Sequence, residues 1–321
     1  MRAALFSGVQ DRLQVGIGPL KAWLFPKRVY LQLEDQAITA MALEGRRIVW
    51  LETIQLPVGL CENGEPIRTD SLGDLLGDLF VERGYAGARV DAVLPAAASQ
   101  MRLVQWPEGR WPEDPERTLA LHENQLRLRM PLGYLDLHIV DFKQEPPVSL
   151  LVTVPSSVLD KWIEVCLLAG LSLNRMEAAK TCVCRGLLAM RRSVDVAGTL
   201  VLQLEHHRSS VLLVEDDIPR YERRLPGVEQ PQELQSELAS LMRFCRQQFS
   251  AFNDYSLCLH GSAVGQIAQV AGLSELFDAP WQIVDPIAEG WLVNISPEFG
   301  MQPDGSSLAL LWGLAATEVM T

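Results

Sequence analysis

The sequence of 321 residues lacks a hydrophobic run long enough to cross a membrane and lacks the layout of a secretion signal. No uninterrupted apolar stretch reaches the roughly 20 residues that span a bilayer. The apolar stretches near the start are broken by Gln10-Asp11-Arg12 and by Gly16-Ile17-Gly18-Pro19, whereas a signal peptide needs a continuous apolar segment. The sequence therefore predicts a cytoplasmic protein.

The sequence also has little positive charge and no cysteine pattern typical of metal or redox sites. Its formal net charge of -12 disfavours nucleic acid as the main partner, because phosphate binding relies on Lys and Arg. Cys182-Val183-Cys184 is too tightly spaced for a CxxC motif, and no histidine ligands accompany it. We expect no metal site, and we expect the cysteines to be buried free thiols.

Positive charge gathers in the first 28 residues, which we call the N-terminal lead. Five cations against one acid give the lead a net charge of +4, so the rest of the chain carries -12 - 4 = -16. Because the lead ends in the basic and apolar segment 21–28, we predict weak contact with an anionic membrane surface, with a solvated tail as the alternative. The residues predicted to touch lipid are Lys21, Trp23, Leu24, Phe25, Lys27 and Arg28.

The same strand pattern occurs twice along the chain. Alternating apolar residues and polar turns predict strands at 29–33, 37–43 and 47–54, and again at 199–204, 210–214 and 220–225. The tetrad Leu31-Gln32-Leu33-Glu34 is identical to Leu202-Gln203-Leu204-Glu205, and each tetrad ends a strand before a polar turn. Identity in the same context predicts a duplicated α/β core with a mixed sheet and covering helices in each half.

Helices and further strands alternate around these repeats. A helix is predicted at 72–83 with Ser71 as its cap, and others are predicted to begin at about Pro115, Ser156, Ala178 and Pro231. The further strands are predicted at 90–94, 135–142, 148–154 and 256–259.

The order of short motifs resembles one family of the actin-like superfold, the type IV pilus assembly protein PilM family, in a degenerate HofM- or MshI-like form. The motifs span nearly the whole chain, and their order carries the resemblance more than any one of them. They are DAVLP at 91–95, VQWP at 104–107, LVTVP at 151–155, AGL at 169–171, WQIVDP at 281–286 and GLA at 313–315.

This resemblance implies an actin-like fold of two RNase H-like α/β halves. The first half would span 29–170, with an inserted subdomain at about 96–150, and a C-terminal helix at 306–321 would complete it. The second half would span 171–305, and the lead, 1–28, would precede both.

The resemblance fails at the residues that handle nucleotide. Members of the superfold carry Asp-x-Gly in the first hairpin of each half, where this chain has Gln32-Leu33-Glu34 and Gln203-Leu204-Glu205. Each Glu places a negative charge where phosphate would lie, and like charges repel strongly in a poorly solvated cleft. Only the adenosine-type segment survives in part, as His260-Gly261. We therefore expect a pseudo-ATPase with no catalytic residues and no cofactor, while binding of Mg-ATP stays open.

The resemblance thus implies a scaffold and not an enzyme. Such a protein would lie at the cytoplasmic face of the inner membrane and bind the short N-terminal tail of a bitopic PilN-like partner, with pilus motor or platform proteins as further partners. One alternative is an enzyme related to sugar or acetate kinases, which would need the catalytic Asp and phosphate-binding glycines that the hairpins lack. Another is the cytoplasmic module of a type II secretion platform protein.

The partner's tail is expected to lie as an extended peptide between the core sheet of the first half and the inserted subdomain. The predicted walls of this groove are the strand 90–94, with Val93 and Leu94, and the segment Met130-Pro131-Leu132. A segment that contains proline favours a sheet edge, which suits such a groove. The alternative is that Val93 belongs to the core.

Overall fold

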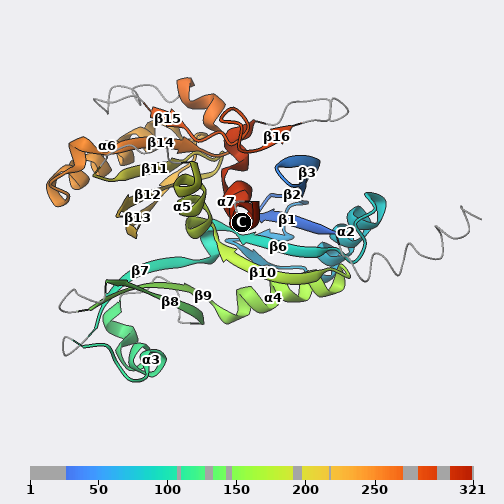
Figure 1. Cartoon of the computed structure of the whole chain (residues 1–321), viewed down its shortest axis with the longest axis horizontal. Helices are drawn as coiled ribbons and strands as arrows, with labels where there is room; N and C mark the ends of the chain where they lie inside the picture. Colours follow the sequence, from blue (N-terminus) through green and yellow to red (C-terminus); the bar gives the residue numbers. More distant parts are fainter. Residues whose placement is uncertain are drawn as a thin grey trace, which may run out of the picture.

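The computed structural model describes residues 27–106, 110–126, 133–141, 147–190, 197–216, 218–269, 281–294 and 304–319, and all structural statements refer to them. Two sheets with their own helices lie one above the other in Figure 1, and a smaller third sheet extends at the lower left. No helix in these ranges is both long and apolar enough to span a bilayer. All six cysteines are buried and free, as the sequence predicts.

The first half is built on a six-stranded sheet in the order β10-β6-β1-β2-β3-β16. Its strands are β1 (Arg28–Leu33), β2 (Ala37–Glu44), β3 (Arg47–Gln55), β6 (Arg89–Leu94), β10 (Ser172–Ala178) and β16 (Val293–Asn294). The first three form the predicted antiparallel meander, and β6 runs parallel to β1. Two helices, α2 (Thr69–Glu82) and α4 (Ser156–Leu168), cover one face of this sheet and bury Phe80 and Trp162 completely.

The second half repeats this arrangement on a five-stranded sheet in the order β13-β12-β11-β14-β15. Its strands are β11 (Thr199–Gln203), β12 (Arg208–Glu215), β13 (Ile218–Pro226), β14 (Ser256–His260) and β15 (Trp281–Ile283), with the helix α6 (Pro231–Gln248). Here β14 runs parallel to β11, as β6 does to β1. The two meanders with their parallel neighbours confirm the predicted duplicated α/β core.

Two helices, α5 (Ala179–Met190) and α7 (Ala309–Val319), lie between the two sheets (Figure 1). They share one apolar cluster with Met41 and Val93 of the first sheet and with Val201 and Leu212 of the second. Because one cluster draws on both sheets, burial of apolar surface holds the two halves together.

The inserted subdomain is a three-stranded sheet in the order β7-β9-β8 with one helix beside it. Its elements are β7 (Gln100–Gln105), α3 (Pro115–Leu126), β8 (Tyr134–Asp141) and β9 (Val148–Val154). A separate small core forms around Trp106, whose indole N–H donates to Ser149 Oγ at 2.7 Å. A short ribbon of β4 (Cys61–Glu62) and β5 (Glu65–Pro66) links the first meander to α2.

The structure differs from the sequence expectations in the start of α2, in the sheet that β10 and β16 join and in the extent of the insertion. β16 pairs with β3 of the first sheet, although residues 171–305 were expected in the second half. Helix α2 begins at Thr69, so Ser71 lies inside it and is not its cap. β10 pairs with β6 of the first sheet, although residues from 171 onward were expected in the second half. Strand β9 belongs to the subdomain sheet, so the insertion extends past residue 150 to Val154. An edge strand such as β10 carries many partly exposed polar residues, and it therefore lacks the apolar pattern of a core strand.

Candidate functional site

The two Gln-Leu-Glu tetrads fold in the same way at the ends of β1 and β11. Gln32 Nε2 donates to Glu34 Oε1 at 2.5 Å, and Gln203 Nε2 donates to Glu205 Oε1 at 3.2 Å. The sequence repeat is therefore also a repeat in side-chain geometry. In each half the glutamine orients the carboxyl group that follows it by two residues.

The two glutamines differ in their second contact. Each lies opposite a hydroxyl residue of the neighbouring strand, Thr39 for Gln32 and Ser210 for Gln203. The Ser210 hydroxyl donates to Gln203 Oε1 at 3.2 Å, whereas Thr39 Oγ1 lies 3.0 Å from Thr53 Oγ1. Gln32 Oε1 is consequently buried without a hydrogen-bond partner, whereas Gln203 Oε1 accepts a hydrogen bond from Ser210.

Glu34 and Glu205 interact across the cleft between the two halves. Burial and, second to it, the charge of Glu205 raise the pKa of Glu34 to about 7. Burial also raises the pKa of Glu205, against hydrogen bonds from Ser262 and Gln203 that favour its charged form. A cleft that already holds two acidic groups in a poorly solvated place disfavours a further anion such as a phosphate chain.

His260 and Gly261 follow at the end of β14, beside the second tetrad. His260 is only 3% exposed, and this burial lowers its pKa to about 4, so the imidazole is neutral. Gly261 has φ +116°, and a Cβ there would lie 2.2 Å from the carbonyl oxygen of Leu204. The glycine is thus explained by close backbone packing within the second half.

Side chains of the two halves also contact one another directly around the cleft. His207 Nε2 lies 2.7 Å from Gln36 Oε1, and Arg208 Nη1 donates to Asn63 Oδ1 at 2.7 Å. Further contacts are the Lys180–Glu222 ion pair and the hydrogen bond from Arg224 Nη2 to the carbonyl oxygen of Ala97. Polar groups of the protein itself therefore connect the two sides.

The predicted groove residues Val93 and Leu94 are not available to a peptide. They are 0% and 3% exposed, because β6 lies inside its sheet between β10 and β1 with helices on both faces. Assigning these two residues to a groove wall was wrong, and the core alternative for Val93 holds. The other predicted wall, Met130-Pro131-Leu132, lies outside the described residues.

Of the residues predicted to touch lipid, Lys27 and Arg28 are described, and Lys21, Trp23, Leu24 and Phe25 lie outside the described residues. The Lys27 ammonium donates to the carbonyl oxygen of Gly84 at 3.1 Å. Arg28 Nε lies 3.7 Å from Asp91 Oδ2. Both cations already contact the protein, so the membrane contact stays a prediction.

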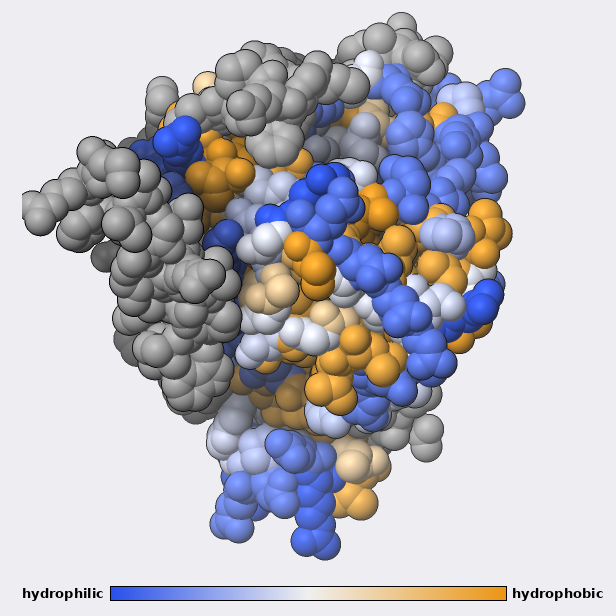
Figure 2. All heavy atoms as spheres, turned by 90° about the vertical axis from the view of Figure 1, so that its right-hand side faces the viewer, coloured by the Kyte–Doolittle hydropathy of each residue, from blue (hydrophilic) through white to orange (hydrophobic). Residues whose placement is uncertain are grey.

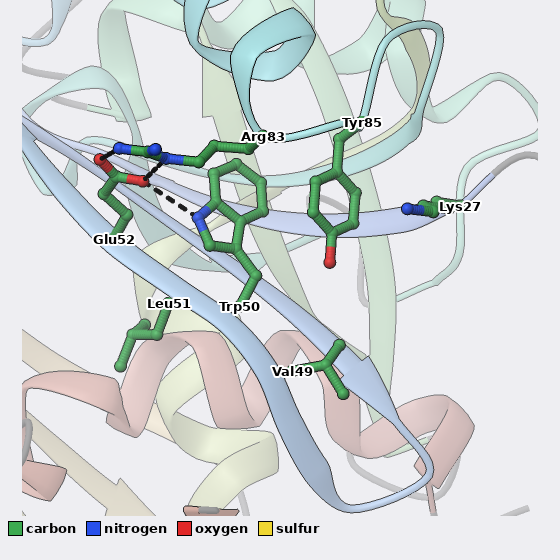
Figure 3. Close-up of a pocket in the computed structure, with 7 residues that line it drawn as sticks. All are labelled: Lys27, Val49, Trp50, Leu51, Glu52, Arg83 and Tyr85. Atoms are coloured by element: carbon green, nitrogen blue, oxygen red, sulfur yellow. Dashed lines mark hydrogen bonds and ion pairs between the residues drawn. The ribbon is translucent and has the colours of Figure 1, made fainter. Parts of the chain in front are cut away.

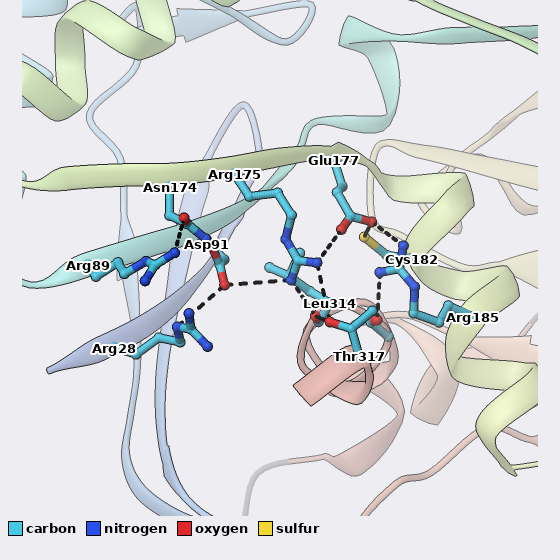
Figure 4. Close-up of polar contacts among 11 residues, drawn as sticks. Arg28, Arg89, Asp91, Asn174, Arg175, Glu177, Cys182, Arg185, Leu314 and Thr317 are labelled. Carbon is cyan, nitrogen blue, oxygen red and sulfur yellow. Dashed lines mark hydrogen bonds and ion pairs between the residues drawn. The ribbon is translucent and has the colours of Figure 1, made fainter. Parts of the chain in front are cut away.

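Asp91 was not singled out from the sequence, yet it organises a polar cluster (Figure 4). Its side chain is completely buried and accepts from Asn174 Nδ2 at 2.5 Å, with Arg175 Nη2 3.6 Å from Oδ2. The same Arg175 nitrogen donates to the carbonyl oxygen of Leu314 in α7. Asp91 could have been found from the sequence, because it is an acidic residue inside the otherwise apolar strand 90–94. Ser262, which donates its hydroxyl to Glu205 Oε2, directly follows His260-Gly261 in the adenosine-type segment.

Among the described residues, no cluster of three or more His, Cys, Asp or Glu side chains is arranged to hold a metal ion. Amides and hydroxyls are the hydrogen-bond partners of the cleft glutamates, and Asp35 and His206 also act electrostatically on Glu34. Glu34, whose pKa is raised to about 7, can exchange a proton near neutral pH.

Glu34→Gln should stabilise the protein at pH 8 and have little effect at pH 5. The folded-state pKa of Glu34 lies above its ordinary value of 4.5, so folding favours the protonated form and stability falls as pH rises through about 7. Since the carboxyl group is partly exposed, solvent screening limits the gain to about 1–2 kcal/mol. Urea denaturation at both pH values measures it. Glu62→Gln, an exposed control, should show no such difference, and equal effects of Glu34→Gln at both pH values would contradict the coupling.

Comparison with known proteins defines the fold class. No protein-family profile matches the sequence, and no match was found among curated proteins. The chain has an actin-like fold: a Bacteroides thetaiotaomicron protein of unknown function, described as having an actin-like ATPase fold, aligns over 90% of this chain and 96% of its own at 10% identity and a TM-score of 0.53. A chain of the "PilM-PilN type IV pilus biogenesis complex" aligns over 91% of this chain and 98% of its own at 17% identity and a TM-score of 0.73. These similarities confirm the predicted fold.

Proposed function

We propose that this chain is a scaffold of a type IV pilus or related pseudopilus assembly machine, belongs to the PilM family, and lies at the cytoplasmic face of the inner membrane. There it would bind the cytoplasmic tail of a bitopic PilN-like protein. The observation that carries the proposal is the end-to-end structural similarity to a chain of a PilM-PilN complex, with 91% of this chain and 98% of the other aligned. An alignment of this extent includes both halves and the inserted subdomain, so the similarity supports a similar role for the chain as a whole.

We also propose that the chain does not hydrolyse ATP. In place of the superfold's Asp-x-Gly hairpins it carries Gln32-x-Glu34 and Gln203-x-Glu205, and the two glutamates interact within the cleft. Bringing a triphosphate beside them would add repulsion, and the cations named around the cleft are already engaged, Arg208 with Asn63, Lys180 with Glu222 and Arg224 with Ala97.

Titration calorimetry with Mg-ATP should accordingly show no binding tighter than about 1 mM, which corresponds to about 4 kcal/mol. The physical reason is electrostatic, so the double substitution Glu34→Gly/Glu205→Gly should tighten binding relative to the natural chain. The exposed Glu62→Gly serves as the matched control and should leave binding unchanged. Micromolar binding or measurable turnover by the natural chain would contradict the proposal.

The partner's tail is best placed along β8 of the inserted subdomain. In the described part of the chain β8 pairs only with β9, so its other edge is open, whereas β7 lies beside β13. Tyr134 begins β8, is 50% exposed, and donates its hydroxyl to Asp160 Oδ1 of α4 at 3.1 Å. The open edge therefore starts where the subdomain meets the first half, and an extended peptide can add to such an edge as a further strand.

A synthetic peptide of the cytoplasmic tail of the proposed bitopic partner should bind with micromolar affinity. Tyr134→Glu should weaken this binding by about tenfold, because it places a charge at the start of the edge. Leu121→Glu, which changes an exposed apolar residue of α3 in the same subdomain, should leave it unchanged. Binding that is equal in both variants would reject the β8 edge. No binding of either the peptide or the full partner would reject the proposed function.

A further inference from the structure

The outer surface of helices α2 and α4, which we call the acidic face, carries mainly negative charge. Lys161 is the one basic residue of the two helices, and it pairs with Glu65 at 2.6 Å. All acidic residues of the two helices are exposed, and they are Asp70, Asp74, Asp78, Glu82, Asp160 and Glu164. Such a surface repels anionic lipid and nucleic acid and attracts a cationic partner.

The C-terminal ends of α2 and α4 lie at the same end of the first half. α2 is followed by β6 and α4 by β10, and these strands run parallel with Arg89 paired to Ser172 near their starts. Neither helix has a basic residue in its last turn, and both helices lie wholly within the described ranges. A helix C-terminus carries a partial negative charge that a nearby cation stabilises. The two helix ends therefore add to the attraction for a cationic partner.

Arg83, which directly follows α2, offsets little of this negative charge. Its guanidinium forms a two-point ion pair with Glu52 of β3, at 2.7 and 2.9 Å, and Figure 3 shows it directed at that carboxylate. The Trp50 indole donates to the same carboxylate at 3.1 Å. Arg83 also lies 3.4 Å from Glu82 Oε1, so Glu82 alone among the acids of the face is partly compensated by it.

Exposed apolar side chains lie among these acids. Val81 of α2 is 66% exposed, and Leu167 and Leu168 of α4 are 75% and 47% exposed. The two helices are in close contact, since a Cβ at Gly73 would lie 2.5 Å from Leu168 Cβ. Figure 2 views the side of the molecule on which α2 lies and shows hydrophobic residues directly beside hydrophilic ones. Exposed apolar groups bordered by charges of one sign suit an occupant that is both apolar and basic.

The acidic face is continuous with the β8 edge proposed for the partner's tail. Tyr134, at the start of β8, donates its hydroxyl to Asp160 Oδ1 of α4 at 3.1 Å. From Asp160 to Leu167 the helix rises by about 10 Å, at about 1.5 Å per residue. An extended peptide covers that length with about three or four residues. A tail that leaves the β8 edge at Tyr134 therefore reaches Leu167 within a few residues.

We propose that the acidic face binds the membrane-proximal part of the partner's cytoplasmic tail, through Lys or Arg side chains and the apolar residues beside them. Cytoplasmic segments that adjoin a membrane span carry an excess of Lys and Arg, so a bitopic partner supplies this chemistry next to its span. The tail then runs antiparallel to β8, because its later part leaves the edge where β8 begins. This inference rests on the proposed function and assigns a site to the part of the tail that β8 does not contact.

Calorimetry with the full chain and two peptides tests the charge pairing. One peptide is the whole cytoplasmic tail of the proposed partner, and the other is the same tail with every Lys and Arg replaced by Gln. Asp78→Asn/Glu164→Gln should weaken binding of the natural tail about fivefold at about 50 mM salt and by less than about twofold at about 500 mM, because salt screens exposed charges. The Gln-substituted tail should bind the natural chain and this variant equally. Glu233→Gln/Asp254→Asn is the matched control, since it removes two exposed charges from the second half and should bind like the natural chain.

The apolar part of the site provides a second readout. Leu167→Gln should weaken binding of the natural tail about threefold, whereas Val58→Gln, at an exposed apolar position outside the face, should leave it unchanged. If the tail binds and is weakened by Tyr134→Glu, yet binds Asp78→Asn/Glu164→Gln and Leu167→Gln like the natural chain, this inference alone is overturned. If the whole tail does not bind the natural chain at all, the proposed function is rejected and this inference with it.

Discussion

Replacing Gly313 with alanine should destabilise the protein by about 3–4 kcal/mol, which is among the largest effects expected of a single added methyl group. Gly313 lies in α7 where this helix crosses α5. A Cβ at this position would lie 1.8 Å from the carbonyl oxygen of Cys182 and 2.5 Å from its carbonyl carbon. On the facing side, Gly186 also packs against α7, since its own Cβ would lie 3.3 Å from Gly313 Cα. Backbone faces backbone, so no side chain can move aside to make room.

The effect should extend beyond the helix pair, because α5 and α7 belong to the apolar cluster that draws on both sheets. Urea denaturation followed by circular dichroism measures the loss. Gly265→Ala is the matched control, since a Cβ there has open space around it, and it should change stability by less than about 1 kcal/mol. If the two variants unfolded at the same urea concentration, the close crossing of α5 and α7 would be contradicted.

Acid should destabilise the protein through His260 by about 3 kcal/mol between pH 6.5 and pH 4. Burial lowers the folded-state pKa of His260 from 6.5 to about 4. The unfolded chain therefore gains a proton in this window that the folded chain does not accept. The stability that the neutral imidazole allows is complete above pH 6.5 and is lost as pH falls through about 4.

His260→Met, which keeps an apolar side chain of similar size, should remove this part of the acid dependence. The difference in stability between the variant and the natural chain should be constant above pH 6.5, and the variant should gain about 3 kcal/mol relative to the natural chain as pH falls to 4. The control is His138→Met, an exposed position of β8 that should leave the acid profile intact. Parallel curves for the natural chain and His260→Met would contradict the buried neutral histidine.

The opposite trends of Glu34 and His260 act in one cleft. Rising pH costs stability at Glu34, and falling pH costs stability at His260. Between about pH 4.5 and 6.5 the two trends offset each other in part. Glu34→Gln leaves the His260 trend, so its stability should rise more steeply with pH than that of the natural chain. His260→Met leaves the Glu34 trend, so its stability should fall as pH rises.

Local patterns were sufficient for most elements of the fold. The helix predicted to begin at Ser156 and the one predicted at Pro231 begin at those residues, because each follows a turn and repeats its apolar residues at helical spacing. The strand at 148–154 was predicted with its observed bounds. β10 and α2 were misjudged in placement and start, because an edge strand lacks a clear apolar pattern and Ser71 resembled a cap.

The candidate site was only partly predictable. The two tetrads could be found because they are identical and share one context, and their glutamine–glutamate hydrogen bonds are local. Nothing local distinguishes Val93 as a core residue from Val93 as the wall of a groove, since an apolar strand suits both. Likewise, the sequence did not show that Ser262 bonds Glu205, because these residues meet only when β14 pairs with β11.

The sequence by itself determined the two α/β halves, the paired Gln-Leu-Glu tetrads and the missing Asp-x-Gly hairpins, since these follow from residue identity and spacing along the chain. Only the tertiary structure decided that Glu34 meets Glu205 and that Val93 is buried between helices. Each of these facts depends on contacts between segments far apart in the chain. Such contacts arise when apolar faces are buried together, and no short pattern of residues specifies them.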